Sequence, residues 1–162
     1  MAVLKLQVDE FDAIDYDLIA IHSTVEDYRM AFLLNQQLPI ILHKHKTAIE
    51  ISAKEGDVSF PYFVYDDEKA ETNWVLIPNK NEIVVRKKST GQNLFLGAQV
   101  EIATRVYLLP ELKKVDYFLK IEHQDTFYQM DELLSAIKKI NQVSTVYAVD
   151  PQQIKSKNNL IF

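Results

Sequence analysis

Cysteine is absent from this chain of 162 residues. Its absence excludes disulfides, thiolate catalysis and cysteine metal sites, and it fits a protein that works in a reducing compartment. Glycine is almost as scarce, with only Gly56, Gly91 and Gly97. A phosphate-binding loop needs several glycines close together so that backbone amides can approach the ligand, and this sequence has no such stretch.

Long apolar runs and an excess of basic residues are also missing. No run approaches the roughly 18 apolar residues that a membrane span needs, and the first residues lack the basic segment and apolar core of a secretory signal. We therefore expect a cytoplasmic protein without membrane contact. The formal net charge of -5, from 23 acidic and 18 basic residues, disfavours a nucleic-acid partner, because proteins that bind phosphate backbones usually show the opposite balance.

The composition is typical of a soluble globular protein, with 48% apolar and 25% charged residues. A chain of this length buries about 70% of its unfolded surface, so it needs no disulfide or metal to fold. The sequence contains no internal repeat, low-complexity tract or flexible linker. We expect residues 1–162 to form a single domain.

Two segments have the apolar spacing of amphipathic helices. The first is expected over residues 24–37, where Ser23 and Glu26 have the spacing of a capping box and Pro39 ends the helix. The second lies within residues 125–141. Its acidic residues come early and its lysines late, which complements the helix dipole.

Strand patterns account for most of the remaining chain. Single strands are expected over residues 14–21, 48–53, 58–67 and 143–150, the third with an edge position or bulge at Pro61. Hairpins are expected over 73–87, around a turn at 78–81, and over 104–122, around a turn at 110–114. Residues 94–104 show no clear pattern. The order predicts an α+β fold, a largely antiparallel sheet with two helices packed on one face.

The second expected hairpin contains the stretch LPELKKVDY, residues 109–117. Pro110 suits a tight turn because its φ is already fixed. In the outgoing strand, alternation places Val115 and Tyr117 on the core face with Leu119 and Ile121. The other face carries Asp116, Phe118, Lys120 and Glu122, a mixed set for which partial cover is one expectation.

This stretch resembles the signature that names the IPExxxVDY family, a group of small bacterial proteins without an assigned function. The positions that match are Pro110, Glu111, Val115, Asp116 and Tyr117. Leu109 stands where isoleucine is usual. The closing residues KSKNNLIF and the overall layout are similar too, so the resemblance covers most of the chain. It implies little about function, because the family itself is uncharacterised.

Two groups of residues invite a catalytic or metal hypothesis. Glu111 and Asp116 are carboxylates near one turn, but no histidine or third acid completes an acid–base set. We therefore interpret the motif as structural, with Glu111 accepting from turn amides and Asp116 paired with a lysine or tyrosine, and we predict no catalytic residue. His43 and His45 lack the further ligands that zinc requires, so we expect no metal and no other cofactor.

Two further groups are candidate binding residues. Arg86, Lys87 and Lys88 form a basic cluster that either contacts phosphate or an acidic partner, or guards a strand edge against aggregation. Tyr62 and Tyr65 lie in the aromatic stretch FPYFVY, which forms either an exposed partner surface or a thick core.

These observations leave three functional hypotheses. The leading one is a non-enzymatic binding or assembly module, acting through a protein partner or through self-association as a homodimer. The alternative is a small-ligand binder or enzyme that uses a cleft near Glu111, Asp116 and Tyr117. The third, an accessory protein that binds RNA or an acidic partner, rests only on the lysine cluster.

Overall fold

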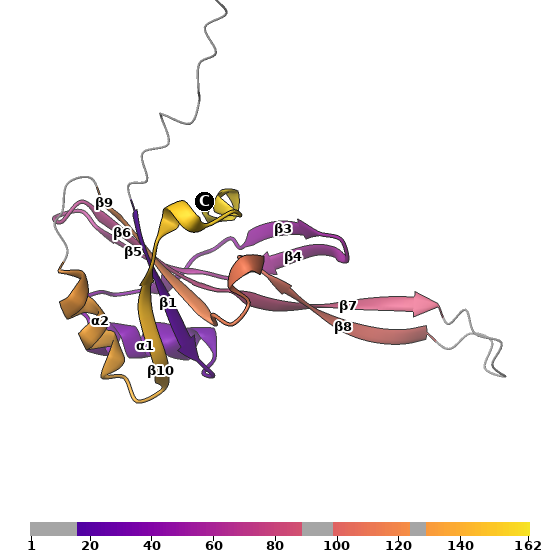
Figure 1. The fold of residues 1–162 in the computed structure, drawn as a ribbon, viewed down its shortest axis with the longest axis horizontal. Helices are drawn as coiled ribbons and strands as arrows, with labels where there is room; N and C mark the ends of the chain where they lie inside the picture. The colour runs from indigo at the N-terminus through magenta and orange to yellow at the C-terminus, as the bar shows by residue number, and fades with distance from the viewer. Residues whose placement is uncertain (1–15, 89–98, 124–128) are drawn as a thin grey trace, which may run out of the picture.

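The computed structural model describes residues 16–88, 99–123 and 129–162 (Figure 1). They form an α+β fold, as predicted, built on a six-stranded antiparallel sheet in the order β10-β1-β9-β6-β5-β2. Two separate two-stranded ribbons, β3–β4 and β7–β8, extend from it. The strands are β1 (Tyr16–Ser23), β2 (His43–Lys44), β3 (Ile49–Ala53), β4 (Gly56–Phe60), β5 (Phe63–Asp67), β6 (Thr72–Pro78), β7 (Lys80–Lys88), β8 (Gln99–Tyr107), β9 (Tyr117–His123) and β10 (Val143–Val149).

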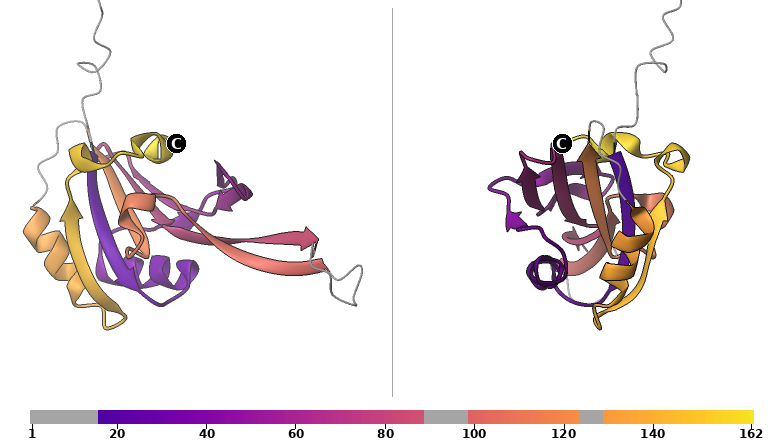
Figure 2. Two further views of the ribbon diagram at one scale, coloured as in Figure 1. Left: turned by 45° about the vertical axis from the view of Figure 1, so that its right-hand side comes forward. Right: turned by 90° about the vertical axis from the view of Figure 1, so that its left-hand side faces the viewer.

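The two α-helices, α1 (Asp27–Gln37) and α2 (Met130–Lys138), pack on the same face of the six-stranded sheet (Figure 2). Helix α1 ends where expected, but it begins at Asp27 rather than Thr24. The predicted capping box is wrong, because Ser23 is the last residue of β1 and the helix has no side-chain cap at Glu26. The early part of the second expected helix, residues 124–128, lies outside the described residues.

Both faces of the central strands are buried, so the protein has two cores. The helix-side core includes Ile19, Leu34, Leu76, Leu119 and Ile137. The far-side core includes Leu18, Phe60, Ile77, Phe118 and Leu160. The mixed face of strand 115–122 is covered more fully at its centre than at its ends, where Asp116 and Glu122 are half-buried. Ribbon β3–β4, a short 3-10 helix at Pro110–Leu112 and the C-terminal segment cover that face and bury Phe118 and Lys120.

Neither predicted hairpin forms. Strand β6 pairs with β5 and β9, whereas β7 pairs only with β8 among the described strands. The chain therefore leaves the large sheet after Pro78, and it returns to it at Tyr117, where β9 runs between β1 and β6. The expected strand 58–67 is likewise divided, because its two halves, β4 and β5, belong to different sheets. In each case the alternation identified the strands but not their partners.

The β7–β8 ribbon projects away from the rest of the molecule (Figures 1 and 2). At its base it packs against β4. A Cβ atom on Gly56 would lie only 2.8 Å from the side chain of Ile83, and the φ of +138° at Gly56 also favours glycine. The amide of Asn81 donates to the backbone carbonyl of Ser59. These contacts hold the base of the ribbon to the body, and the paired strands run on beyond them.

Candidate functional site

The motif segment, residues 109–117, crosses from the β7–β8 ribbon to the central strand β9. Pro110 begins the short 3-10 helix, while Leu109 and Val115 are buried in the far-side core. Every polar side chain in this stretch that the sequence analysis singled out contacts a segment that is distant in sequence.

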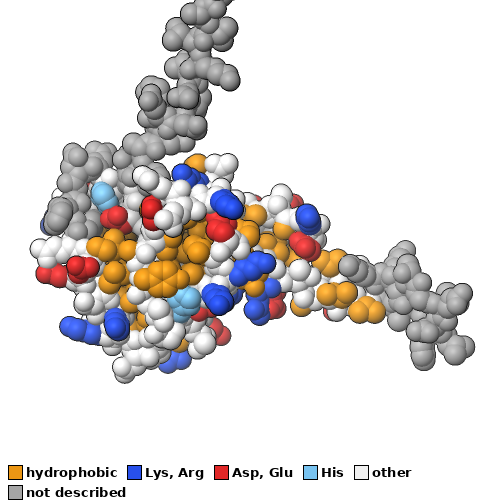
Figure 3. All heavy atoms as spheres, in the orientation of Figure 1, with side chains coloured by type: hydrophobic (Ala, Val, Ile, Leu, Met, Phe, Trp, Pro, Cys, Tyr) orange, Lys and Arg blue, Asp and Glu red, His pale blue; other side chains and the backbone are white. Residues whose placement is uncertain are grey.

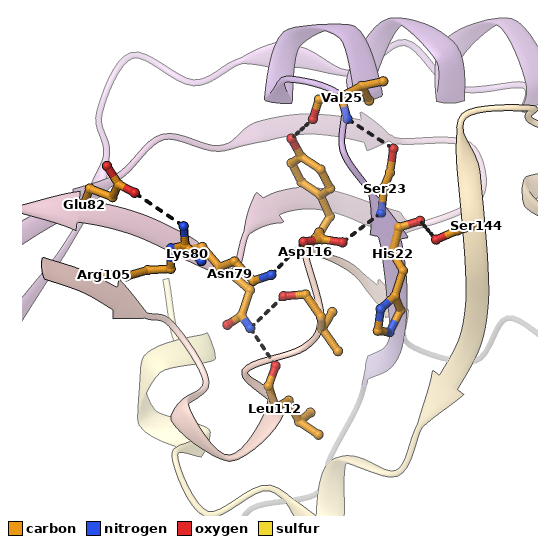
Figure 4. Close-up of polar contacts among 12 residues, drawn as sticks. His22, Ser23, Val25, Asn79, Lys80, Glu82, Arg105, Leu112, Asp116 and Ser144 are labelled. Carbon is orange, nitrogen blue, oxygen red and sulfur yellow. Dashed lines mark hydrogen bonds and ion pairs between the residues drawn. The ribbon is translucent and has the colours of Figure 1, made fainter. Parts of the chain in front are cut away.

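Asn79 is the residue that holds the motif segment in place (Figure 4). It is fully buried in the connection between β6 and β7. Its side-chain amide donates to the carbonyls of Leu112 and Val115 at 2.8 and 3.0 Å, and its side-chain oxygen accepts from the amide of Leu109 at 2.8 Å. One side chain thereby bonds three backbone groups, of which the Leu112 carbonyl also accepts from the amide of Val115. In the sequence, Asn79 has only the features of a turn residue, and nothing near it indicates this role.

Asp116, which directly precedes β9, is bonded through its side chain to β1 and to β7. One carboxylate oxygen accepts from the backbone amide of Ser23, at the end of β1, at 2.9 Å. The other forms an ion pair with the ammonium group of Lys80, at the start of β7, at 2.8 Å. Both side chains of this pair are only 28% exposed, so water screens the pair less than it would at the surface.

Tyr117 and Glu111 extend these connections to the helix and to the C-terminal segment. The hydroxyl of Tyr117 donates to the carbonyl of Val25, just before α1. Burial raises the pKa of this phenol, with smaller contributions from Asp27 and other nearby carboxylates, so it stays protonated as the donor.

Glu111 was expected to accept from amides of its own turn. It binds the C-terminal segment instead. Its carboxylate accepts from the backbone amides of Lys155 and Ser156, each at 2.9 Å, and from the Ser156 hydroxyl at 3.0 Å. Burial alone would raise the pKa of Glu111, but the hydrogen bonds outweigh it and hold the pKa below the ordinary value. The two motif carboxylates thus serve different segments and have the contacts of a structural clamp.

Lys120 is a buried cation in the far-side core that the sequence analysis also missed. Its ammonium donates to the carbonyl of Leu160 at 2.7 Å and pairs with Glu122. It lies 5.0 Å from the ring centroid of Tyr16 and 4.7 Å from that of Phe162. Together with Glu111, it attaches the C-terminal segment to the sheet.

The candidate binding residues are not brought together into one site. Tyr62 is buried in the far-side core and stacks on His45, whereas Tyr65 packs against the helix-side core. Of the two alternatives for this stretch, the structure has the core, since Phe60 and Phe63 are buried too. Arg86 lies on the ribbon and pairs with Glu101 at 3.0 Å, while the side chains of Lys87 and Lys88 lie outside the described residues.

The described histidines have separate neighbours. His45 contacts Thr47 through its ring nitrogen, His22 contacts Tyr147, and His123 contacts Asp17. Within residues 16–88, 99–123 and 129–162, no three His, Asp or Glu side chains converge as metal ligands would.

The β7–β8 ribbon has two chemically different faces. Residues directly opposite each other in an antiparallel pair share a face, and faces alternate along each strand. The charged face holds the pairs Arg86–Glu101 and Glu82–Arg105. The apolar face carries Ile83, Val85, Val100, Ile102, Thr104 and Val106, and the register also assigns to it Asn81 at the base and Lys87 opposite Val100. Val106 is buried at the base, but exposure increases outward, to 41% at Ile102 and 50% at Val100.

No protein-family model matches the chain, and neither the curated proteins nor the solved structures include a significant match. None of the described helices is long and apolar enough to span a membrane. The chain's own geometry is therefore the basis for a functional proposal.

Proposed function

We propose that this protein is a non-enzymatic binding or assembly module that engages a protein partner through the β7–β8 ribbon and also self-associates as a homodimer. The observation that carries the proposal is the projecting ribbon, whose apolar face continues beyond its contacts with the body.

The physical argument rests on the stability of an isolated ribbon. A two-stranded ribbon is marginally stable in water unless an apolar face is covered. Here β4 covers the base near Ile83, while Val100 and Ile102 stay exposed farther out. A partner that covers this outer part would remove apolar surface from water at about 25 cal/mol per Å². The charged face, with its ion pairs, keeps the opposite side soluble.

The alternative of a small-ligand binder or enzyme near the motif receives no support from the contacts. Glu111, Asp116 and Tyr117 are engaged with protein groups in the described structure. We also propose, from the match at residues 109–117 and the charge and composition, a cytoplasmic protein related to the bacterial IPExxxVDY family.

The test is a comparison of two single substitutions on opposite faces of the ribbon. Ile102→Glu changes the apolar face. Val84→Glu changes the charged face, in the pair Val84–Ala103 that neighbours the pair Val85–Ile102, and Val84 is 59% exposed. Tagged parent and variants are used to purify partners from the source cell, and each candidate is then titrated as a purified protein. We expect Ile102→Glu to weaken binding about tenfold or more, because it buries an unpaired charge, and Val84→Glu to bind like the parent.

Equal binding by both variants would overturn the ribbon as the docking element. A parent chain that retains no protein beyond those bound by the tag alone would overturn the partner-binding proposal itself.

A further inference from the structure

Strand β10 forms one edge of the six-stranded sheet. It pairs with β1 from Leu18↔Val149 to Ser23↔Val143, and no described strand pairs with its outer side. An open edge presents unpaired backbone donors and acceptors and is a template for another strand. Natural edges are usually shortened, bulged, or guarded by charge or proline.

A register shift in the β1–β10 ladder, between the pairs His22↔Thr145 and Ser23↔Val143, marks an irregularity at Ser144, but β10 carries no further guard along its length. Its sequence, VSTVYAV, has no charged residue, no proline and no glycine, and it is rich in β-branched residues. Ser144, Thr145, Tyr147 and Ala148 are exposed. The opposite edge, β2, is protected by being only two residues long, one of them Lys44.

Apolar surface continues along the face beside this edge. Tyr147 lies opposite Ala20, whose side chain is buried in the far-side core, yet Tyr147 itself is 38% exposed. The elements that cover the far-side core therefore leave Tyr147 partly open. Figure 3 shows hydrophobic side chains gathered on the face of the molecule where β1 and β10 lie.

We propose that β10 pairs antiparallel with β10 of a second copy of this chain, about a two-fold axis at Val146, the midpoint of the strand. This inference rests on the proposed self-association and names its surface. The pairing places Thr145 opposite the second copy's Tyr147 and Ser144 opposite its Ala148, pairs without like charges. The two Tyr147 side chains become diagonal neighbours on one face and extend the apolar surface across the axis.

The charges that flank β10 favour the second copy as the occupant. Lys138 and Lys139 end helix α2, which leads into β10 through residues 140–142, and Asp150 directly follows the strand; all three are exposed. Antiparallel self-pairing brings the basic end of each strand to the acidic end of the other. The arrangement also closes on itself, because each copy uses its β10 edge once and the β2 edge is guarded, so a dimer forms and not a fibre.

The test uses a charge exchange across the proposed axis. Ser144→Glu with Ala148→Glu sets two glutamates against each other in both symmetric pairs. Ser144→Lys with Ala148→Glu sets lysine against glutamate instead. Both double variants lose the same bond from the Ser144 hydroxyl to the carbonyl of His22, so they are matched controls for each other. Circular dichroism melting establishes that each variant is folded.

Light scattering is recorded from about 1 to about 300 μM, since a single strand pair is a small interface and its association depends on concentration. We expect the parent to approach twice its 18.8 kDa mass. The glutamate pair should weaken dimerisation about tenfold or more, and the lysine–glutamate pair should restore it to within about threefold of the parent.

The possible failures are distinguishable. A parent that dimerises while the glutamate variant dimerises equally well overturns the β10 interface and leaves self-association standing. Dissociation of both variants to the same extent overturns the antiparallel pairing. A parent that remains monomeric throughout overturns both self-association and this inference, while partner binding through Ile102 is tested separately.

Discussion

Asp116 is the residue whose replacement tests the structural interpretation of the motif most directly. In Asp116→Asn the amide can still accept from the Ser23 backbone, but it loses the ion pair with Lys80 in a half-buried position. We expect a loss of roughly 1–3 kcal/mol in the free energy of unfolding, because a partly buried charge loses its partner. For a domain of this size the melting temperature falls by several degrees.

The control for this prediction is Asp66→Asn, an exposed aspartate on β5. Thermal unfolding should show a change below about 0.5 kcal/mol for this surface substitution. An Asp116→Asn variant as stable as the parent would contradict the structural role and return Asp116 to the list of functional candidates.

Glu111 should give the stability of the protein a defined pH dependence. The hydrogen bonds from Lys155 and Ser156 lower its pKa in the folded state. Its contribution is therefore fully present above the unfolded pKa, near 4.3, and is lost as the pH falls through the lower folded value. The difference in unfolding free energy between the parent and Glu111→Gln should be largest at neutral pH and should shrink in acid.

Urea unfolding of both chains, from about pH 7 to about pH 3.5, measures this difference, because the urea midpoint and slope give the free energy at each pH. A difference that stays constant over the whole range would show that the charge of Glu111 is not what attaches the C-terminal segment.

Sequence reasoning reached some of these residue roles and missed others for a physical reason. An aspartate beside a strand is a poor β-former, so the expectation of a lysine or tyrosine partner for Asp116 could be drawn from its position alone. The side-chain partners of Asn79, and the Leu160 carbonyl that accepts from Lys120, lie 30 or more residues away. Their roles depend on how the chain folds back, and no local pattern records that.

At the scale of elements, the periodicity of apolar residues predicted the positions of helices and strands better than it predicted which strands pair. The end of α1 and nearly all of β10 could be predicted, because proline and apolar spacing act locally. Both hairpins failed, because two adjacent strands joined by a short connection usually pair, whereas here the chain passes between sheets at Asn79, after β6, and again between Tyr107 and Tyr117, after β8.

The buried outer face of β9 could not be predicted either. Alternation of Phe118 and Lys120 with apolar residues is typical of a strand with one solvated face. The C-terminal segment covers that face, and Lys120 is tolerated there because Leu160 and Glu122 satisfy its ammonium group. A segment about 40 residues away in sequence thus decides the environment of this strand.

For the molecule as a whole, the two cores are coupled because they share the central strands. Strands β1, β6 and β9 contribute side chains to both the helix-side and the far-side core. The body should therefore unfold as one cooperative unit. The base of the β7–β8 ribbon packs against the far-side core through Ile83 and Val106. The outer part of the ribbon contributes to neither core.

This separation predicts that the outer ribbon can be removed without unfolding the body. Val84 and Ala103 lie directly opposite each other, so replacing residues 85–102 with Asn-Gly joins them through a two-residue hairpin turn. The shortened chain keeps Ile83 against β4 and the whole Asn79 network. We expect one cooperative thermal transition within a few degrees of the parent, unchanged dimerisation through β10, and loss of any partner that binds at Ile102.

Asn79→Ala is the contrasting variant, because it removes the side-chain partner of the Leu109 amide and of the Val115 carbonyl, whereas the Leu112 carbonyl still accepts from the amide of Val115. Each unpaired group costs about 1–3 kcal/mol, so this single substitution should destabilise the body more than removal of the outer ribbon does. If instead the shortened chain loses its cooperative transition, the ribbon is part of the folding unit and its apolar face serves stability. If the shortened chain keeps a folded body but no longer binds the partner, the outer ribbon serves binding. The two variants then separate the contacts that the fold requires from the surface that binds the partner.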